Sequence, residues 1–213
     1  MNFQYFSSHI NLHNFGIHDV VSKNATMFMY PENFALKGSN EVASCLLWYI
    51  QNQIPTVENK LFLFLDNSAG QNKNRIVFAL LQYLAITRFE SVTVIFPVPG
   101  HSYMPIDQDF SIIEKKIKKE NRVLSPSQWT QLIVNARNNQ PFNLAYVLHP
   151  FTPNLEPDGR PIIKIRNFRE SLAPLLNTRL FLNGINKIIF RNDFSCLTSR
   201  VLSRECEVPL AIL

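Results

Sequence analysis

Asp66 is the residue of this chain that is best placed to take part in chemistry. It directly follows Leu61–Leu65, a run of five apolar residues typical of a strand buried on both faces. Open α/β sheets bind their ligands at the carboxyl ends of such strands. A carboxylate at this position must be solvated, paired or bound to a metal ion, because an unpaired buried charge is very costly. The sequence therefore indicates a binding or catalytic site at Asp66.

Two further acids, Asp107 and Glu114, lie on a predicted helix later in the chain. At 100° per residue they fall within about 20° of each other. They flank an inward-facing stripe made of Phe110, Ile113 and Ile117. Two like charges this close to a core gain from a shared cation, so the pair indicates a metal site.

Simpler interpretations of this helix stay open. Asp107 could serve only to cap the helix, which is worth about 1 kcal/mol. Glu114 could pair with Lys118, one turn further along. The lysines between residues 115 and 119 are typical of a solvated face more often than of a nucleic-acid contact.

His101 lies in a proline-containing loop and suits proton transfer or a contact to phosphate. A hydrolase that uses Ser68 with His101 is a weaker alternative, because the string DNSAG is not a G-x-S-x-G nucleophile elbow. His9, His13 and His18 do not meet a metal-ligand spacing, so we expect them to be structural.

The elements that would position these residues are strands first, followed by helices and strands in turn. This order indicates a mixed sheet with antiparallel leading strands and parallel strands after them. The predicted strands are Tyr5–Leu12, Phe15–Val21, Ala25–Tyr30, Leu61–Leu65, Val92–Phe96, Asn143–Leu148, Ile162–Ile165 and Lys187–Phe190. The predicted helices are one that Ser39 caps and Ile54-Pro55 ends, then Arg75–Phe89, Asp107–Glu120 and Pro126–Arg137, the last with a capping box that starts at Ser125.

Four segments resemble a transposon-associated family of uncharacterised animal proteins. Members of that family carry strings close to SDNCGGQNKN and GHSFLPxDRDFGxIEK, together with a YNFGIHD segment followed by GxNEVxSCL. The corresponding segments here are LDNSAGQNKN (Leu65–Asn74), GHSYMPIDQDFSIIEK (Gly100–Lys115), HNFGIHD (His13–Asp19) and GSNEVASCL (Gly38–Leu46). The resemblance covers about Phe3–Val134.

That family looks like the ribonuclease H-like fold of cut-and-paste transposases and retroviral integrases. Such enzymes place one acid on the first sheet strand, a second after the fourth strand and a third on a later helix, and the acids hold two Mg²⁺ ions for phosphodiester chemistry. The resemblance implies that Asp66 is the second acid and that Asp107 or Glu114 is the third, with Mg²⁺ or Mn²⁺ as the metal. It also implies that Glu114 is a ligand or general base, and that His101 contacts the scissile phosphate or shuttles protons.

The partner that the resemblance implies is nucleic acid, and DNA is the expected form. Four polar residues that follow Asp66 would bind its backbone phosphates near a helix N-terminus. These residues are Gln71, Asn72, Lys73 and Arg75. The formal net charge of +5 is compatible with a polyanionic partner.

The first-strand acid has no direct counterpart here, because no acid precedes Asp19 in the chain. Asp19 or Glu32 would have to replace it. Otherwise the site is a two-acid remnant that binds Mg²⁺ weakly. The expected fold class is therefore α/β, with a ribonuclease H-like mixed sheet that is flanked by helices and lacks its first strand. A non-catalytic nucleic-acid- or protein-binding module on the same fold is the alternative to a two-metal nuclease or transposase.

The length of 213 residues is enough for one sizeable domain. We expect a core at residues 1–149 and a C-terminal extension at 150–213, either separate or part of the same domain. Three cysteines without a CxxC motif favour a reducing compartment, and Cys45 is expected to be a small core residue. Without an apolar run long enough to span a membrane and without a secretory signal, we expect a nuclear or cytoplasmic protein with no membrane partner.

Overall fold

The structure is a computed structural model that describes residues 11–98, 103–120, 126–148, 160, 162–176, 187–191, 196–199 and 210–212. Within these ranges the strands are β1 (Leu12–Asp19), β2 (Ala25–Pro31), β3 (Lys60–Leu65), β4 (Ser91–Ile95), β5 (Asn143–Leu148), β6 (Ile162–Lys164), β7 (Lys187–Arg191), β8 (Cys196–Ser199) and β9 (Leu210–Ile212). The helices are α1 (Ser39–Gln53), α2 (Arg75–Thr87), α3 (Pro105–Ile117), α4 (Pro126–Val134), α5 (Phe168–Ser171) and α6 (Ala173–Leu176).

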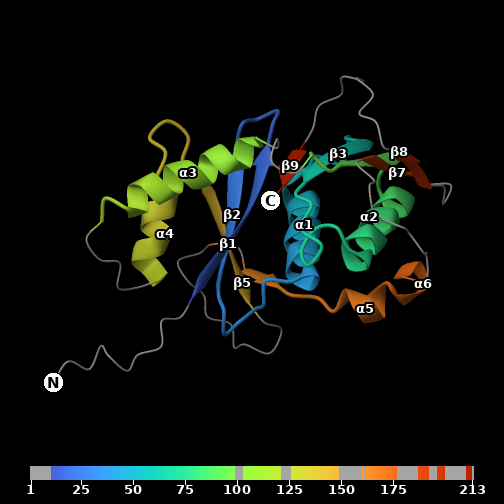
Figure 1. Ribbon diagram of the computed structural model, residues 1–213, viewed down its shortest axis with the longest axis horizontal. Coiled ribbons are helices and arrows are strands. Elements are labelled where there is room, and N and C mark those ends of the chain that lie inside the picture. Colours follow the sequence, from blue (N-terminus) through green and yellow to red (C-terminus); the bar gives the residue numbers. More distant parts are fainter. Residues whose placement is uncertain are drawn as a thin grey trace.

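The protein has a mixed α/β fold whose strands form two mixed groups, joined through β9 (Figure 1). The strand order is β6-β5-β2-β1-β9-β3-β4-β7-β8. β9 pairs antiparallel with the end of β1, at Ile17–Asp19, and parallel with the end of β3, at Leu63–Leu65. Strands from the last quarter of the chain therefore complete a sheet that the first hundred residues begin.

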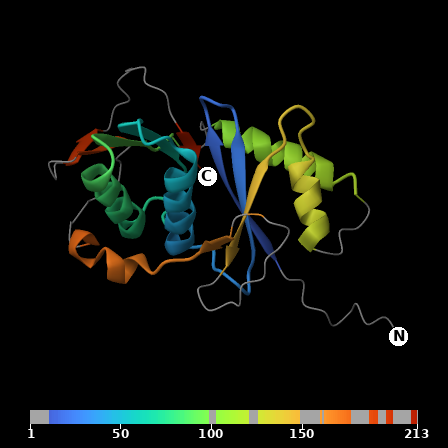
Figure 2. The same ribbon diagram turned by 180° about the vertical axis from the view of Figure 1, so that it is seen from behind.

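Helices cover both faces of the sheet and form two separate cores. α1 and α2 lie on one side and α3 and α4 on the other, as the front and back views show (Figures 1 and 2). Alternate residues of β2 serve the two cores: Phe28 and Tyr30 join the core under α1 and α2, whereas Met27 and Met29 join the core under α3 and α4. This two-residue alternation is the geometry of a strand enclosed on both faces.

The predicted burial of Leu61–Leu65 on both faces is confirmed. Leu61, Leu63 and Leu65 are buried in the core under α1 and α2, and Phe64 packs from the opposite face against the second core. Cys45 is fully buried in the first core, as predicted, and burial raises the pKa of its thiol.

One boundary prediction is wrong at the first hairpin. The predicted strand Phe15–Val21 overlaps β1, which begins earlier, at Leu12, and ends two residues earlier, at Asp19. A tight turn ends the strand: the Asp19 carboxylate accepts hydrogen bonds from the Ser22 hydroxyl and the Val21 amide, and Lys23 has a positive φ of 58°. Residues 5–10 of the first predicted strand lie outside the described residues.

The predicted cap of α1 is also wrong. Gly38 is the N-cap residue and no side chain caps the helix, so Ser39 is already its first helical residue. Ser125, which begins the capping box predicted for α4, lies outside the described residues. The predictions for β2, β5 and the bodies of α1, α2 and α3 agree with the structure to within a few residues.

Gly16 allows α3 to approach β1, and this contact gives a testable prediction. A Cβ at Gly16 would lie 2.6 Å from Ile106 Cδ1 and 3.0 Å from Phe110 Cζ, and Ile106 is fully buried. We expect Gly16→Ala to lower the free energy of unfolding by about 1–3 kcal/mol, because the core has no space for the extra methyl group. Urea unfolding would measure the change.

Gly70 provides the matched control for this substitution. A Cβ there would meet nothing within 4 Å, so Gly70→Ala should change the free energy of unfolding by less than about 0.5 kcal/mol. Equal effects of the two substitutions would contradict the close packing of α3 on β1.

Candidate functional site

Asp66 lies in a crevice at the carboxyl end of β3. Leu65 of β3 and Ile17 of β1 both pair with Ile212 of β9, and β1 runs antiparallel to β3. Asp66, the residue after Leu65, therefore lies beside the first half of β1, which extends past the carboxyl end of β3. The crevice has a volume of about 180 Å³. Its lining residues are Asn14, Phe15, Tyr30, Lys37, Gly38, Val42, Asp66, Gln71 and Phe110.

The polar groups of this crevice, here called the Asp66 crevice, are of several kinds. Asp66 supplies a carboxylate, Lys37 an ammonium group and Gln71 an amide. The Asn14 Oδ1 atom is buried and accepts no hydrogen bond within the described part of the chain. Burial raises the pKa of the Tyr30 phenol well above its usual value, so its hydroxyl remains a donor. Together these groups can contact an anion and a cation side by side.

The N-terminus of α1 adds partial positive charge to the same crevice. Gly38, the N-cap residue, lines the crevice together with Lys37 and the first-turn residue Val42. A helix N-terminus attracts anions because its first amide groups are unpaired and the helix dipole is positive there. The carboxylate of Glu41, in the first turn, accepts a hydrogen bond from the Leu36 amide at 3.2 Å.

The other two predicted acids have local partners of their own. Asp107 accepts a hydrogen bond from the Met104 amide at 2.9 Å, so it caps α3 from the third helical position. Glu114 is exposed and pairs with Lys118 at 2.7 Å, and this hydrogen-bonded ion pair lowers the pKa of Glu114. The simpler interpretation of Glu114 is thus confirmed, and Asp107 does cap the helix.

The structure does not bring Asp66, Asp107 and Glu114 together as a three-carboxylate metal site. Among the residues that it describes, no three His, Cys, Asp or Glu side chains gather to hold a metal ion. The physical reason is the orientation of α3, which presents the ring of Phe110 to the crevice. His101 lies outside the described residues.

The two acids considered as replacements for the missing first acid also have partners elsewhere. Asp19 holds the turn between β1 and β2 through Ser22 and Val21. Glu32 accepts a hydrogen bond from Asn11, which lowers its pKa. Neither lines the Asp66 crevice.

Of the four predicted phosphate contacts, Gln71 lines the Asp66 crevice. Its loop is a compact turn in which the Ser68 carbonyl accepts hydrogen bonds from the amides of Gln71, Asn72 and Lys73. Asn72 is only 1% exposed, and its side-chain amide has no hydrogen-bond partner within the described residues. Asn72 is thus placed to shape the loop rather than to meet a ligand from solvent.

Lys73 and Arg75 contact other parts of the protein. The Lys73 ammonium donates to Asn67 Oδ1 at 3.0 Å and lies 4.9 Å from the centre of the Phe96 ring, and burial lowers its pKa. The Arg75 guanidinium donates to the Leu176 carbonyl. The Asn74 side chain caps α2, so the N-terminus of that helix already has a partner.

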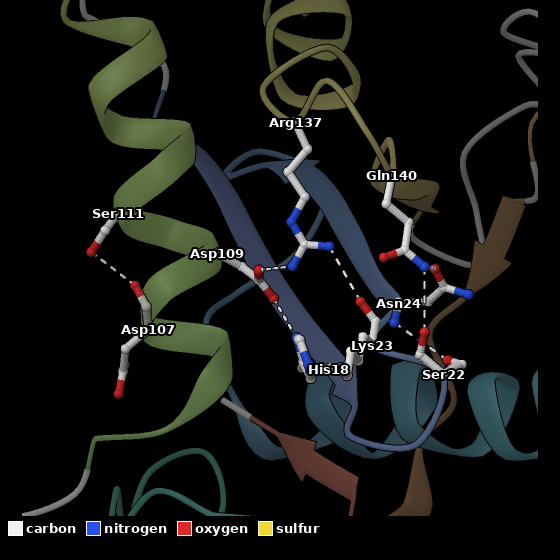
Figure 3. A network of polar contacts seen from close by, with 9 residues as sticks. All are labelled: His18, Ser22, Lys23, Asn24, Asp107, Asp109, Ser111, Arg137 and Gln140. Carbon is white, nitrogen blue, oxygen red and sulfur yellow. Dashed lines mark hydrogen bonds and ion pairs between the residues drawn. The ribbon is translucent and has the colours of Figure 1, made fainter.

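A buried ionic cluster on α3 is the main feature that the sequence prediction missed. Asp109 is 1% exposed and bonds through one oxygen to His18 Nδ1 at 2.6 Å and through the other to Arg137 (Figure 3). Arg137 also donates to the Lys23 carbonyl and lies over the ring of Phe142. The cluster therefore fastens α3 and the segment after α4 to the β1–β2 hairpin.

One sequence signal could have identified Asp109 as inward-facing. It lies three residues after Ile106 and four before Ile113, and both isoleucines are buried. Residues at these spacings share one face of a helix. A carboxylate on that face needs partners, and here it has two, His18 and Arg137.

The fold and the crevice define a mixed α/β domain with a polar crevice at the carboxyl end of a buried strand. The chain belongs to the family described as Domain of unknown function (DUF7869), whose model matches residues 6–180. No curated protein and no solved structure matches the chain. Within the described ranges, none of the helices combines the length and the apolar character needed to cross a membrane.

The three acids of α3 should differ sharply in their effect on stability. Asp109→Asn removes a buried carboxylate and leaves the partly buried Arg137 without its anion, so we expect the free energy of unfolding to fall by about 3 kcal/mol. Asp107→Asn weakens one cap and should cost about 1 kcal/mol. Urea unfolding of the two variants would measure both changes.

Glu114→Gln is the exposed control for these substitutions and should leave the unfolding midpoint unchanged. If Asp109→Asn lowered stability no more than this control does, the structural role of Asp109 would be refuted.

Proposed function

We propose that this domain binds the sugar-phosphate backbone of nucleic acid at the Asp66 crevice, and that it is a ribonuclease H-like domain of transposase or nuclease ancestry. The observation that carries the proposal is the meeting of Lys37, Gln71 and the α1 N-terminus around Asp66, at the carboxyl end of β3. This is the edge at which α/β sheets bind ligands.

The strand arrangement supports the proposed ancestry. β1 and β2 are antiparallel and β3 and β4 are parallel, which is the arrangement predicted from the order of the elements and expected for the ribonuclease H-like sheet. If β1 and β2 correspond to the second and third strands, then β3 is the fourth strand and Asp66 follows it directly. That is the place where the resemblance puts the second acid. The position between β1 and β3, where a further strand fits, is held by β9.

The groups of the crevice suit a phosphate. Lys37 supplies a full positive charge, and the N-terminus of α1 supplies a partial one, which the Glu41 carboxylate in its first turn offsets in part. The Gln71 amide can donate a hydrogen bond to a phosphate oxygen. Most contacts between proteins and nucleic acids are of this backbone type, and they carry little sequence information.

A divalent cation fits the same crevice as a single ion. Asp66 offers a carboxylate, and the buried Asn14 Oδ1 offers an amide oxygen that has no partner within the described residues. Mg²⁺ is often held by one or two carboxylates together with phosphate oxygens of the ligand. When bound, it would neutralise phosphate charge beside Asp66.

Metal-dependent cleavage of nucleic acid is the second candidate function. Asp66 and Asn14 favour it, because both present oxygen ligands to the crevice. We place binding first because Asp107 and Glu114 bond to Met104 and Lys118 in the structure.

Substitution of Lys37 tests the binding proposal. Lys37→Gln should weaken the binding of a labelled oligonucleotide and lower the slope of log Kd against log salt by about one, because one phosphate contact is lost. Fluorescence anisotropy at several salt concentrations would measure both quantities. The control is Lys60→Gln, since Lys60 is exposed at the opposite end of β3 from Asp66. An unchanged slope in Lys37→Gln would exclude Lys37 as a phosphate contact.

Substitution of Asp66 separates binding from cleavage. With Mg²⁺ or Mn²⁺ and supercoiled plasmid, a nuclease centred on Asp66 should nick the DNA, and Asp66→Asn should abolish the nicking. For the binding function, we expect Mg²⁺ to tighten oligonucleotide binding by the unmodified chain and to have a smaller effect on Asp66→Asn. Nicking that persists in Asp66→Asn would show that Asp66 is not the centre of a nuclease site.

A further inference from the structure

A second concave site lies between α1, α2 and the segment that contains α5. Both views show α5 beside these two helices (Figures 1 and 2). The site, here called the α5 groove, is lined by residues of α1 and α2 and by residues 166–168 and 170–172. Its volume of about 710 Å³ lies within the range of about 300–1,000 Å³ that is usual for small-molecule sites.

The floor of the α5 groove is apolar. Leu47 of α1, Leu80 of α2, Phe168 and Leu172 line the groove, and each is at most 7% exposed. Tyr83 lines it from α2 with 41% of its surface exposed. Aliphatic and aromatic side chains of this kind hold the ring or hydrocarbon part of a small ligand.

Hydrogen bonds to α1 hold the wall that residues 166–172 form. The Arg166 amide donates at 2.9 Å to the hydroxyl of Ser44, which is 3% exposed. The Phe168 amide donates to Asn40 Oδ1 at 3.2 Å. Because these bonds order the wall in the absence of a ligand, binding does not require the wall to be ordered again.

Arg166 gives the α5 groove a preference for anions. Its side chain lines the groove, and no carboxylate among the described residues forms an ion pair with it. A guanidinium group binds a planar carboxylate through two parallel hydrogen bonds. Glu170 also lines the groove, and its carboxylate accepts a hydrogen bond from Asn167 at 2.9 Å. Lys164 and Arg169 bring the cations of this segment to three against that one anion.

We propose that the α5 groove binds a small organic acid, with its aromatic or aliphatic body on the apolar floor and its carboxylate at Arg166. No residue lines both this groove and the Asp66 crevice. The proposal therefore goes beyond the proposed function and does not depend on the binding of nucleic acid.

Three probes that share one ring system test the charge of the ligand. They are 2-naphthoate, the neutral 2-naphthylmethanol and the cationic 2-naphthylmethylammonium. We expect 2-naphthoate to bind at least about fivefold more tightly than either of the others, because a hydrogen bond between two charged groups is stronger than a neutral one. An NMR titration of the ¹⁵N-labelled chain would give each Kd. The shifted amides should be those of residues 166–172 and of the facing turns of α1 and α2.

Two substitutions test the site itself. Arg166→Gln should weaken the binding of 2-naphthoate about tenfold and leave that of 2-naphthylmethanol unchanged. Its matched control is Arg169→Gln, because Arg169 is exposed on α5 and does not line the groove. Ser171 is an exposed residue of the groove, so Ser171→Trp should fill part of the space and weaken the binding of both probes without unfolding the chain.

Three results would overturn the proposal. The first is that 2-naphthoate at millimolar concentration shifts no amide of the groove. The second is that the alcohol or the ammonium probe binds as tightly as 2-naphthoate. The third is that Arg166→Gln and Arg169→Gln bind 2-naphthoate equally well. Nucleic-acid binding is tested separately, by the substitutions of Lys37 and Asp66.

Discussion

The burial of β3 on both faces is the constraint on which the rest of the structure depends. Leu63 and Leu65 are fully buried on one face, and Phe64 packs into a second core on the other. Helices must therefore cover the sheet on both sides, which leaves polar side chains and ligands access only at the strand ends. Asp66 is the first residue beyond this enclosed strand. Its position in a crevice follows directly from the layering of the helices.

The wall that α3 contributes to the crevice depends on an acid that lies elsewhere. Burying the Asp109 carboxylate is costly, and its pairing with His18 and Arg137 offsets that cost only when α3 lies against β1. The same placement brings Ile106 over Gly16 and turns the Phe110 ring toward Asp66. The ionic cluster lies outside the crevice, but it holds α3 in the orientation that places Phe110 in the crevice wall.

Periodicity predicted the parts of this fold that are defined locally. The apolar run Leu61–Leu65 was sufficient to place β3 and, with it, Asp66 at a sheet edge. The three residues of β9 are too few to show a pattern, and their place between β1 and β3 depends on pairing with residues almost two hundred positions earlier. The inward position of Asp109 could be predicted from its spacing to two isoleucines, but its pairing with His18, 91 residues away, could not. The role of Lys37 depends on where the N-terminus of α1 lies relative to β3, which no local pattern indicates.

The charges of the Asp66 crevice link its two proposed ligands. A phosphate gains from Lys37 and from the N-terminus of α1, but the Asp66 carboxylate repels it. A divalent cation held between Asp66 and the phosphate would turn this repulsion into attraction. The phosphate would also supply oxygen ligands to the cation, of which the crevice itself offers few. Each ligand would then raise the affinity for the other by the same factor, because coupling between two binding events is reciprocal. A crevice with one carboxylate and one ammonium group is therefore suited to take up the cation and the nucleic acid together, more strongly than either one alone.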